Sequence, residues 1–153
     1  MSQTLSKTDG PALAALSARF AGTWGLVRDI TDLANRWPGR LEGVAQFMPK
    51  GDGERLIYRE EGLLTFAGLQ AAKATRSYDW LIQAPDEIEV FFEDGRPFHR
   101  FDPTKREVEA EHPCDADLYS VRYVFEKETK WRSEWRVEGP RKDYRMVSVY
   151  TRP

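Results

Sequence analysis

The sequence lacks the features that would place the protein in an oxidising compartment or a membrane. Its single cysteine, Cys114, cannot form an intrachain disulfide. The N-terminal segment MSQTLSKTDG does not have the basic-then-apolar order of a signal peptide. The apolar runs are far shorter than the roughly 20 residues that a membrane helix needs. We therefore expect a soluble, cytoplasmic protein with no membrane partner.

The sequence also lacks an excess of charge of either sign. The 153 residues carry a net charge of −2, with acids and bases interleaved and no basic block. Binding to phosphate backbones needs a clustered positive surface, so we expect no nucleic-acid partner. A glycine-rich phosphate loop, a Gly-x-Ser-x-Gly elbow and a Walker sequence are absent too. The sequence therefore offers none of the standard signatures of those enzyme classes.

What the chain does contain is typical of one folded, strand-rich domain. Aromatic residues make up 12% of the sequence, more than a disordered chain carries. The 31% charged fraction is expected when strands alternate between a core face and a charged outer face. No repeat, low-complexity tract or linker divides the chain. We predict a single domain over residues 1–153, with residues 1–8 as a flexible tail.

One helix and then about ten strands are predicted. Leu13, Leu16 and Phe20 recur at helical spacing after the start signal Asp9-Gly10-Pro11, and the helix stops at Gly22. From there the apolar period is two, and breaks such as Pro38-Gly39 separate the strands. The strand candidates are GTWGLVRDI, LEGVAQFM, RLIYREEGLLTF, LQAAKATRSYDW, EIEVFF, PFHRF, REVEAEH, DLYSVRYVFEK, KWRSEWRVEG and KDYRMVSVYTR.

The connections between these strands decide the fold class. No second helix is long enough for a crossover, so the sheet should be antiparallel and mostly meandering. An open meander of ten strands would leave long edges, and closure into a barrel removes them. The predicted fold is all-β, an antiparallel up-and-down β-barrel of about ten strands with a short N-terminal helix. A two-sheet sandwich is the structural alternative.

The alternation assigns an unusually polar set of side chains to the barrel interior. An interior built for stability alone favours Leu, Ile and Val, which need no hydrogen-bond partners. An apolar lining with a few converging polar groups is typical of a small-molecule site, although buried tyrosines and a satisfied core histidine are the structural alternative. The residues predicted to face inward among the rings include Arg28, Arg76, His112, Tyr119, Tyr123, Ser133, Tyr144 and Ser148.

We predict that this interior binds a small, partly apolar and anionic molecule. Arg28 or Arg76 would meet the negative group, and tyrosines would donate hydrogen bonds. Two alternatives stay open, a cofactor-free enzyme of isomerase or lyase type that uses His112 as acid or base, and a protein-interaction domain with a packed interior. A homodimer also stays open. The predicted ligand-binding residues are Arg28, Arg76, His99, His112, Tyr119, Tyr123, Trp131, Trp135 and Tyr144.

The segment from His112 to Asp117 gathers four potential metal ligands, and His99 could join them from the preceding strand. Zinc sites usually combine paired clusters from two places in the chain, so no metal is predicted. The simpler interpretation is that Asp115 and Asp117 form a turn after Pro113 ends the strand. Nothing in the sequence indicates that Cys114 is activated as a nucleophile.

The string Gly22-Thr23-Trp24, directly after a short helix, resembles the start of the calycins, which include lipocalins, fatty-acid-binding proteins and haem-binding nitrobindins. The resemblance implies a barrel closed at one end by the tryptophan, with Arg145 or Arg152 packed across it. Nitrobindin-like proteins ligate haem through a histidine on a late strand. No histidine follows His112 in this chain, so haem is disfavoured without being excluded, and no cofactor is predicted.

Residues 20–152 also resemble, over almost their whole length, a family of small bacterial proteins of unknown function. Beyond Gly-Thr-Trp, the shared features are Asp94-Gly95-Arg96 with Phe98-His99, then His112 with Cys114 and Asp117, and the segment GPRKDY at 139–144. This resemblance implies a bacterial source and carries no known activity.

Overall fold

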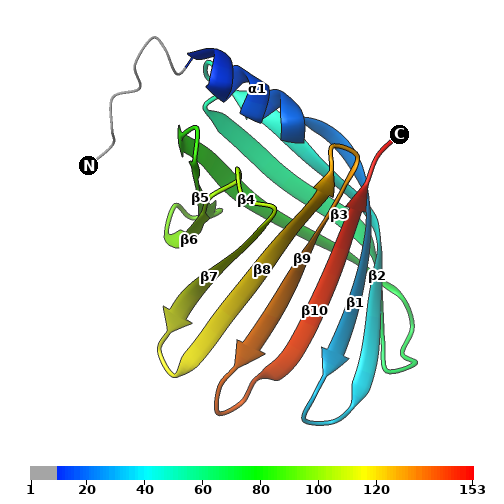
Figure 1. Cartoon of the computed structure of the whole chain (residues 1–153). Helices are drawn as coiled ribbons and strands as arrows, with labels where there is room; N and C mark the ends of the chain where they lie inside the picture. The colour runs from blue at the N-terminus through cyan, green and yellow to red at the C-terminus, as the bar shows by residue number, and fades with distance from the viewer. Residues whose placement is uncertain (1–9) are drawn as a thin grey trace.

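The computed structural model describes residues 10–153, which form a nearly closed antiparallel β-barrel with one helix across one end (Figure 1). The all-β fold predicted from the sequence is confirmed, while the predicted tail at residues 1–8 lies outside the described residues. The elements are α1 (Gly10–Phe20), β1 (Gly22–Asp32), β2 (Trp37–Lys50), β3 (Arg55–Phe66), β4 (Ala72–Ala84), β5 (Glu87–Phe92), β6 (Pro97–Phe101), β7 (Glu107–Cys114), β8 (Asp117–Lys127), β9 (Lys130–Glu138) and β10 (Asp143–Thr151).

All ten strands belong to one sheet, in the order β6-β5-β4-β3-β2-β1-β10-β9-β8-β7. Pairing of β1 with β10, from Gly25 opposite Thr151 to Asp32 opposite Tyr144, curls the meander into a barrel. A single sheet excludes the two-sheet sandwich. The two edge strands, β6 and β7, are consecutive in the chain and share no hydrogen-bonded ladder within the described residues. Side chains bridge this seam, as where the rings of Phe98 and His112 lie 5.2 Å apart.

One predicted break is wrong, because Pro38-Gly39 lies inside β2 and the turn falls at residues 33–36. The Asp32 carboxylate orders this turn by accepting hydrogen bonds from the backbone and side-chain nitrogens of Asn35, each at 3.0 Å. The Pro38 carbonyl accepts from the Ala67 amide at 2.8 Å, so the missing N–H of the proline also faces the end of β3. The β2–β3 ladder ends at the next residue, Gly39 opposite Phe66, so the proline lies at the very start of the strand, where its missing N–H is tolerated.

The β7–β8 connection is also tighter than predicted. Pro113 lies inside β7, which continues to Cys114, and Asp117 already begins β8. Asp115 and Ala116 alone form the turn, with Asp115 in the left-handed region at a φ of 55°. Asp tolerates this conformation better than most residues, so a two-residue hairpin is accessible to the sequence.

The helix closes one end of the barrel. Phe20, the last residue of α1, is buried with its ring centroid 5.5 Å from that of Trp80 and 5.9 Å from that of Trp131. The indole nitrogen of Trp24 donates a hydrogen bond of 2.9 Å to the Phe20 carbonyl, which ties the helix end to β1. The apolar face of the short helix therefore plugs the barrel at this end.

A late arginine packs across this plug, as the calycin resemblance implies. The guanidinium of Arg152 lies 4.1 Å from the Trp24 ring centroid. It also donates hydrogen bonds to the carbonyl oxygens of Arg19 at 2.7 Å and Ala21 at 3.0 Å, which stabilise the C-terminal end of α1. Of the two candidates, Arg152 fills this position, whereas Arg145 is exposed on the outer face of β10.

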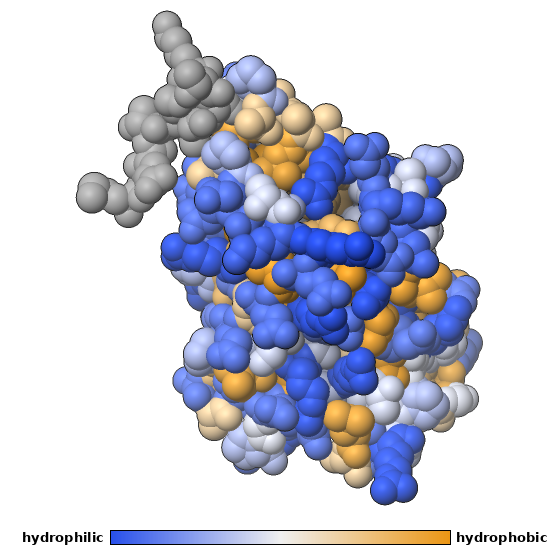
Figure 2. Space-filling view, viewed as in Figure 1, coloured by the Kyte–Doolittle hydropathy of each residue, from blue (hydrophilic) through white to orange (hydrophobic). Residues whose placement is uncertain are grey.

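The outer faces of the late strands are charged, and Figure 2 shows a mostly hydrophilic surface on this side of the molecule. Cross-strand pairs such as Arg122–Glu107 and Arg132–Glu126, each at 2.6 Å, account for this polarity. Within residues 10–153, no helix combines the length and the apolar character needed to cross a membrane.

Arg152→Gln should lower the free energy of unfolding by about 2 kcal/mol, because it removes two charge-assisted hydrogen bonds and a cation–π contact. Urea denaturation followed by tryptophan fluorescence measures the change. Arg145→Gln is the matched control, since its contact with Glu134 is exposed and such pairs contribute at most about 1 kcal/mol. Equal destabilisation by the two substitutions would contradict the role of Arg152.

Candidate functional site

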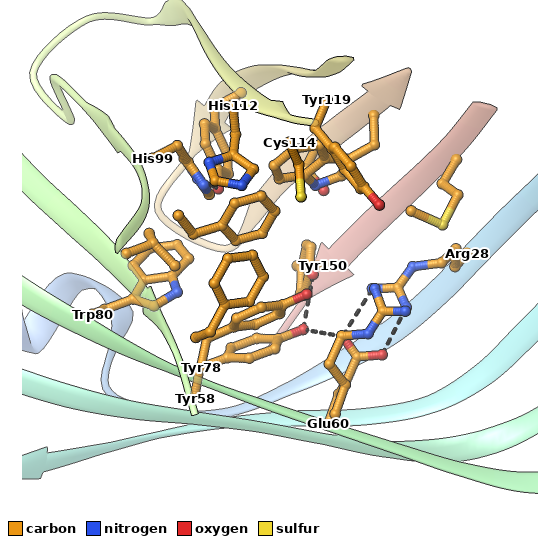
Figure 3. A pocket seen from close by; sticks show the side chains of 18 of the residues that line it. Arg28, Tyr58, Glu60, Tyr78, Trp80, His99, His112, Cys114, Tyr119 and Tyr150 are labelled. Atoms are coloured by element: carbon orange, nitrogen blue, oxygen red, sulfur yellow. Dashed lines mark hydrogen bonds and ion pairs between the residues drawn. The ribbon is translucent and has the colours of Figure 1, made fainter. Parts of the chain in front are cut away.

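A cavity of about 360 Å³ lies inside the barrel, and Figure 3 shows the side chains that line it. Its lining extends from Trp80 and Trp131, which contact Phe20 of α1, to residues beside the β7–β8 and β9–β10 turns. The barrel thus has one end covered by α1 and another that carries the β1–β2, β7–β8 and β9–β10 turns (Figure 1). We call the latter the turn end. All nine residues that the sequence singled out are among the 21 that line the cavity, and their role in binding stays a prediction. They are Arg28, Arg76, His99, His112, Tyr119, Tyr123, Trp131, Trp135 and Tyr144.

The lining concentrates the rings and reactive side chains of the whole chain. All six tyrosines of the sequence, both histidines and the only cysteine contribute to it. Three tryptophans and two phenylalanines join them, so that only Val90 and Met146 present aliphatic side chains. The polar interior predicted from the sequence is therefore present, and its side chains surround a cavity instead of filling the core.

A buried ion pair links β1 to β3 across β2. The Arg28 guanidinium donates to both carboxylate oxygens of Glu60, at 2.7 and 2.9 Å (Figure 3). Its Nε donates to the Ser148 hydroxyl at 2.7 Å. Arg28 is 6% exposed and Glu60 3%. The inward position of β2 between the neighbour of Arg28 and the neighbour of Glu60 is Gly43, which has no side chain, and the ion pair crosses that strand there.

Each partner keeps the other ionised. Burial disfavours both charged forms, but the hydrogen bonds and charge of Glu60 outweigh burial and raise the pKa of Arg28. The same contacts lower the pKa of Glu60. Tyr58 donates to Glu60 at 2.7 Å, and its hydroxyl lies 2.9 Å from that of Tyr150. Burial raises the pKa of Tyr58, so the phenol stays a donor. The charge of Arg28 is therefore neutralised within the wall.

Glu60 was missed by the sequence prediction, although a signal existed. In the segment RLIYREEGLLTF, Leu56, Tyr58 and Glu60 alternate on one face, and Tyr58 and Leu56 are core residues. A glutamate in phase with two apolar residues, on a strand near an inward arginine, is the sequence signature of such a pair.

Arg76 is the cavity arginine without an ion pair among the described residues. Arg28 pairs with Glu60, and Arg96 with Asp94 at 2.7 Å. Arg76 lies on β4 at the turn end and is exposed. Arg76, Tyr144 and Met146 also line a second, outer pocket bounded by the β1–β2 and β9–β10 turns. Arg76 therefore stands where the cavity meets the surface.

Two tyrosines accompany Arg76 at this junction. Burial raises the pKa of Tyr78 and of Tyr144, and the positive charge of Arg76 opposes the rise in both. The two phenols are therefore protonated donors that lie within electrostatic reach of the guanidinium. A cation flanked by neutral hydroxyl donors is suited to an anion.

His99 and Tyr123 form a buried dyad on the β6 side of the cavity. The His99 Nε2 lies 2.7 Å from the Tyr123 hydroxyl, and the side chain is 7% exposed. Burial, with a smaller contribution from the charge of His112, lowers the pKa of His99 to about 3. His99 is therefore neutral, and its Nδ1 is buried with no hydrogen-bond partner among the described residues.

The other predicted reactive groups lie at the turn end. His112 is half-buried, with its ring centroid 5.6 Å from that of Phe92, and Cys114 is exposed two residues further along β7. Across the hairpin, Tyr119 accepts a hydrogen bond of 2.8 Å from Lys142. Over residues 10–153, no three His, Cys, Asp or Glu side chains are grouped to hold a metal ion.

The residues present do not fit a haem in the manner of nitrobindin-like proteins. That arrangement needs a histidine on a late strand, and β9 and β10 carry none. The Nε2 of His99 is engaged by Tyr123, and His112 lies on β7 beside the seam. The absence of a cofactor itself stays a prediction.

The chain belongs to a family described as "Family of unknown function (DUF6314)", which it matches over residues 20–152. No curated protein matches it. Among solved structures, it is similar to the S-type phycobiliprotein lyase CPES from Guillardia theta, with a TM-score of 0.61 and 9% identity over 99% of this chain and 98% of that chain. It is also similar to Rv2717c from M. tuberculosis, with a TM-score of 0.51 and 13% identity over 94% and 98%. At these identities the likeness bears on the fold alone.

Glu60→Gln should destabilise the protein by about 3–5 kcal/mol, because it leaves the Arg28 charge buried without its partner. Urea denaturation of this variant and of the wild type measures the change in the free energy of unfolding. The adjacent Glu61→Gln is the matched control, since Glu61 points outward and its exposed contact with Lys73, at 3.5 Å, contributes at most about 1 kcal/mol. A small effect of Glu60→Gln would show that the pair is not needed.

Stability should fall as the pH is lowered from 7, because burial holds the pKa of His99 in the folded protein at about 3. Between pH 6.5 and about 3 the unfolded chain binds a proton at this residue that the folded protein does not bind. The free energy of unfolding should therefore drop by roughly 2 kcal/mol between pH 7 and pH 5 from this group. His99→Gln should remove that part of the pH dependence, as measured by urea denaturation at both pH values. Parallel pH profiles for variant and wild type would contradict the assignment.

Proposed function

We propose that this chain is a cytoplasmic binding protein that holds a small, partly apolar, anionic molecule in its barrel cavity. The observation that carries the proposal is Arg76, an arginine without an ion pair among the described residues, at the entrance of a cavity lined mostly by aromatic rings. A volume of about 360 Å³ lies within the range of roughly 300–1,000 Å³ that is usual for small-molecule sites.

The charge of the lining supports an anion. Three arginines and one carboxylate contribute to it, and Arg28 and Glu60 cancel each other through the buried ion pair. Arg96 shares its charge with Asp94, so Arg76 supplies the uncompensated charge. A charge beside a low-dielectric cavity is screened less than one on an open surface, and a carboxylate or similar group would give Arg76 the partner it lacks.

The two other interpretations have less support. A protein-interaction domain with a packed interior does not account for a hollow lined by every tyrosine of the chain. An enzyme that uses His112 as acid or base needs a group to orient the imidazole, and no hydrogen bond to His112 occurs among residues 10–153. The enzymatic interpretation, a homodimer and the lack of a nucleic-acid partner all stay predictions.

Two fluorescent dyes that share aromatic rings but differ in charge test the proposal. 8-Anilinonaphthalene-1-sulfonate is an anion, and N-phenyl-1-naphthylamine is its neutral counterpart. Arg76→Gln should weaken binding of the sulfonate about tenfold, since one charge-assisted hydrogen bond is lost, and should leave the neutral dye unchanged. Fluorescence titration gives both dissociation constants.

Arg59→Gln is the matched control for this experiment. Arg59 is exposed on the outer face of β3, where it contacts Ser77, and its substitution should affect neither dye. An unchanged affinity of Arg76→Gln for the sulfonate, or an equal loss for both dyes, would refute anion recognition by Arg76.

A further inference from the structure

We propose that the ligand is a rigid, planar aromatic anion, and not a flexible acyl chain, with its acidic group at Arg76 and its rings in the barrel. The inference rests on the proposed function, because it names the chemical class of the molecule in the same cavity. It is carried by an observation that the charge argument does not use: most of the residues that line the cavity carry aromatic rings.

The composition of the wall is the first observation. Eleven of the 21 lining residues are Tyr, Trp or Phe and two more are His, whereas Val90 and Met146 are the aliphatic ones. Aliphatic side chains would suffice to shield a hydrocarbon chain, and they would leave no hydroxyl or indole groups to satisfy. Rings offer flat faces that prefer stacked or edge-on contacts with other rings, so this wall favours a flat partner.

The arrangement of the rings is the second observation. Phe98 is stacked between Phe92, at a centroid distance of 4.3 Å, and Trp135, at 5.0 Å, with planes within 18° of parallel. On another part of the wall, Trp131 stacks on Tyr150 at 3.8 Å and 7°. Trp135 is half-buried, and among the described residues no ring besides Phe98 stacks on it in parallel. A planar ligand would extend these stacks.

The positions of the charged and apolar parts give the ligand a direction. Arg76, with Tyr78 and Tyr144 near it, lies where the cavity meets the outer pocket at the turn end. At the far end, the rings of Phe20, Trp80 and Trp131 close the barrel under α1. A ligand whose anionic group contacts Arg76 would therefore direct its apolar rings into the barrel.

The cavity wall also favours a rigid ligand over a flexible one. The deep ring network is tied by hydrogen bonds at Tyr58, Tyr150 and Tyr123, so the cavity shape is fixed before any ligand binds. A flexible chain would lose the freedom of many rotatable bonds on entering a fixed cavity, whereas a planar ring system loses little. The wall therefore selects shape as well as polarity.

Two carboxylates with the same number of non-hydrogen atoms provide the test. 2-Naphthoate has two fused rings, and undecanoate has a flexible chain with the same number of carbons. Isothermal titration calorimetry on the full chain should give a dissociation constant about tenfold lower for 2-naphthoate. Trp135→Leu should weaken 2-naphthoate about tenfold and change undecanoate by less than about twofold, because only the rings lose a stacking surface.

Trp37→Leu is the matched control, since it makes the same exchange at a tryptophan that is 51% exposed and does not line the cavity, and it should leave both affinities unchanged. Circular dichroism checks that Trp135→Leu folds, and Phe92→Leu serves in its place if it does not. Undecanoate binding as tightly as 2-naphthoate, or an equal loss of both acids in Trp135→Leu, would overturn this inference.

Arg76→Gln separates the failure of this inference from failure of the proposed function. If that substitution weakens both acids while undecanoate binds as well as 2-naphthoate, anion binding stands and the aromatic class is wrong. If neither acid binds, or if Arg76→Gln weakens neither, both proposals are wrong.

Discussion

The Arg28–Glu60 ion pair sets the electrostatics of the whole interior. It lies in the wall at 6% and 3% exposure, and two further side chains, Tyr58 and Ser148, complete its hydrogen bonds. Such a pair is costly to bury and very costly to break, so it fixes the positions of β1 and β3 relative to each other across β2. Because it is internally neutral, it leaves the cavity polar in one wall without giving that wall a charge.

The consequence is a barrel with two different ends. Under α1, Phe20 and Trp24 fill the interior, and Arg152 secures the helix over them. Toward the turn end the interior is hollow, and Arg76 is the lining arginine that has no ion-pair partner in the described part of the chain. The end under α1 is closed and rigid, and the turn end is accessible, as a binding site inside a barrel requires.

The predictions from the sequence succeeded where a period-two pattern was clear. In β9, Trp131 and Ser133 alternate with charged residues, and both are buried as predicted. The positions of the turns were less predictable, since Pro38-Gly39 and Pro113 lie inside strands. A strand tolerates a proline near its first residue, as at Pro38, or on an edge strand, as at Pro113, and which strands are edges depends on pairing with strands distant in the sequence.

The sequence by itself determined the barrel, its helix and the nine side chains that reach the cavity, because alternation along a strand is a local property. Only the tertiary structure decided which of the two inward arginines has no ion-pair partner within residues 10–153. Arg28 and Arg76 are alike in the sequence, each inward on its strand. Glu60 comes from a third strand and satisfies Arg28, because the strand registers bring the two side chains together over Gly43 of β2. Pairing of charges across strands depends on register and on the space between them, and neither quantity can be read from one strand alone.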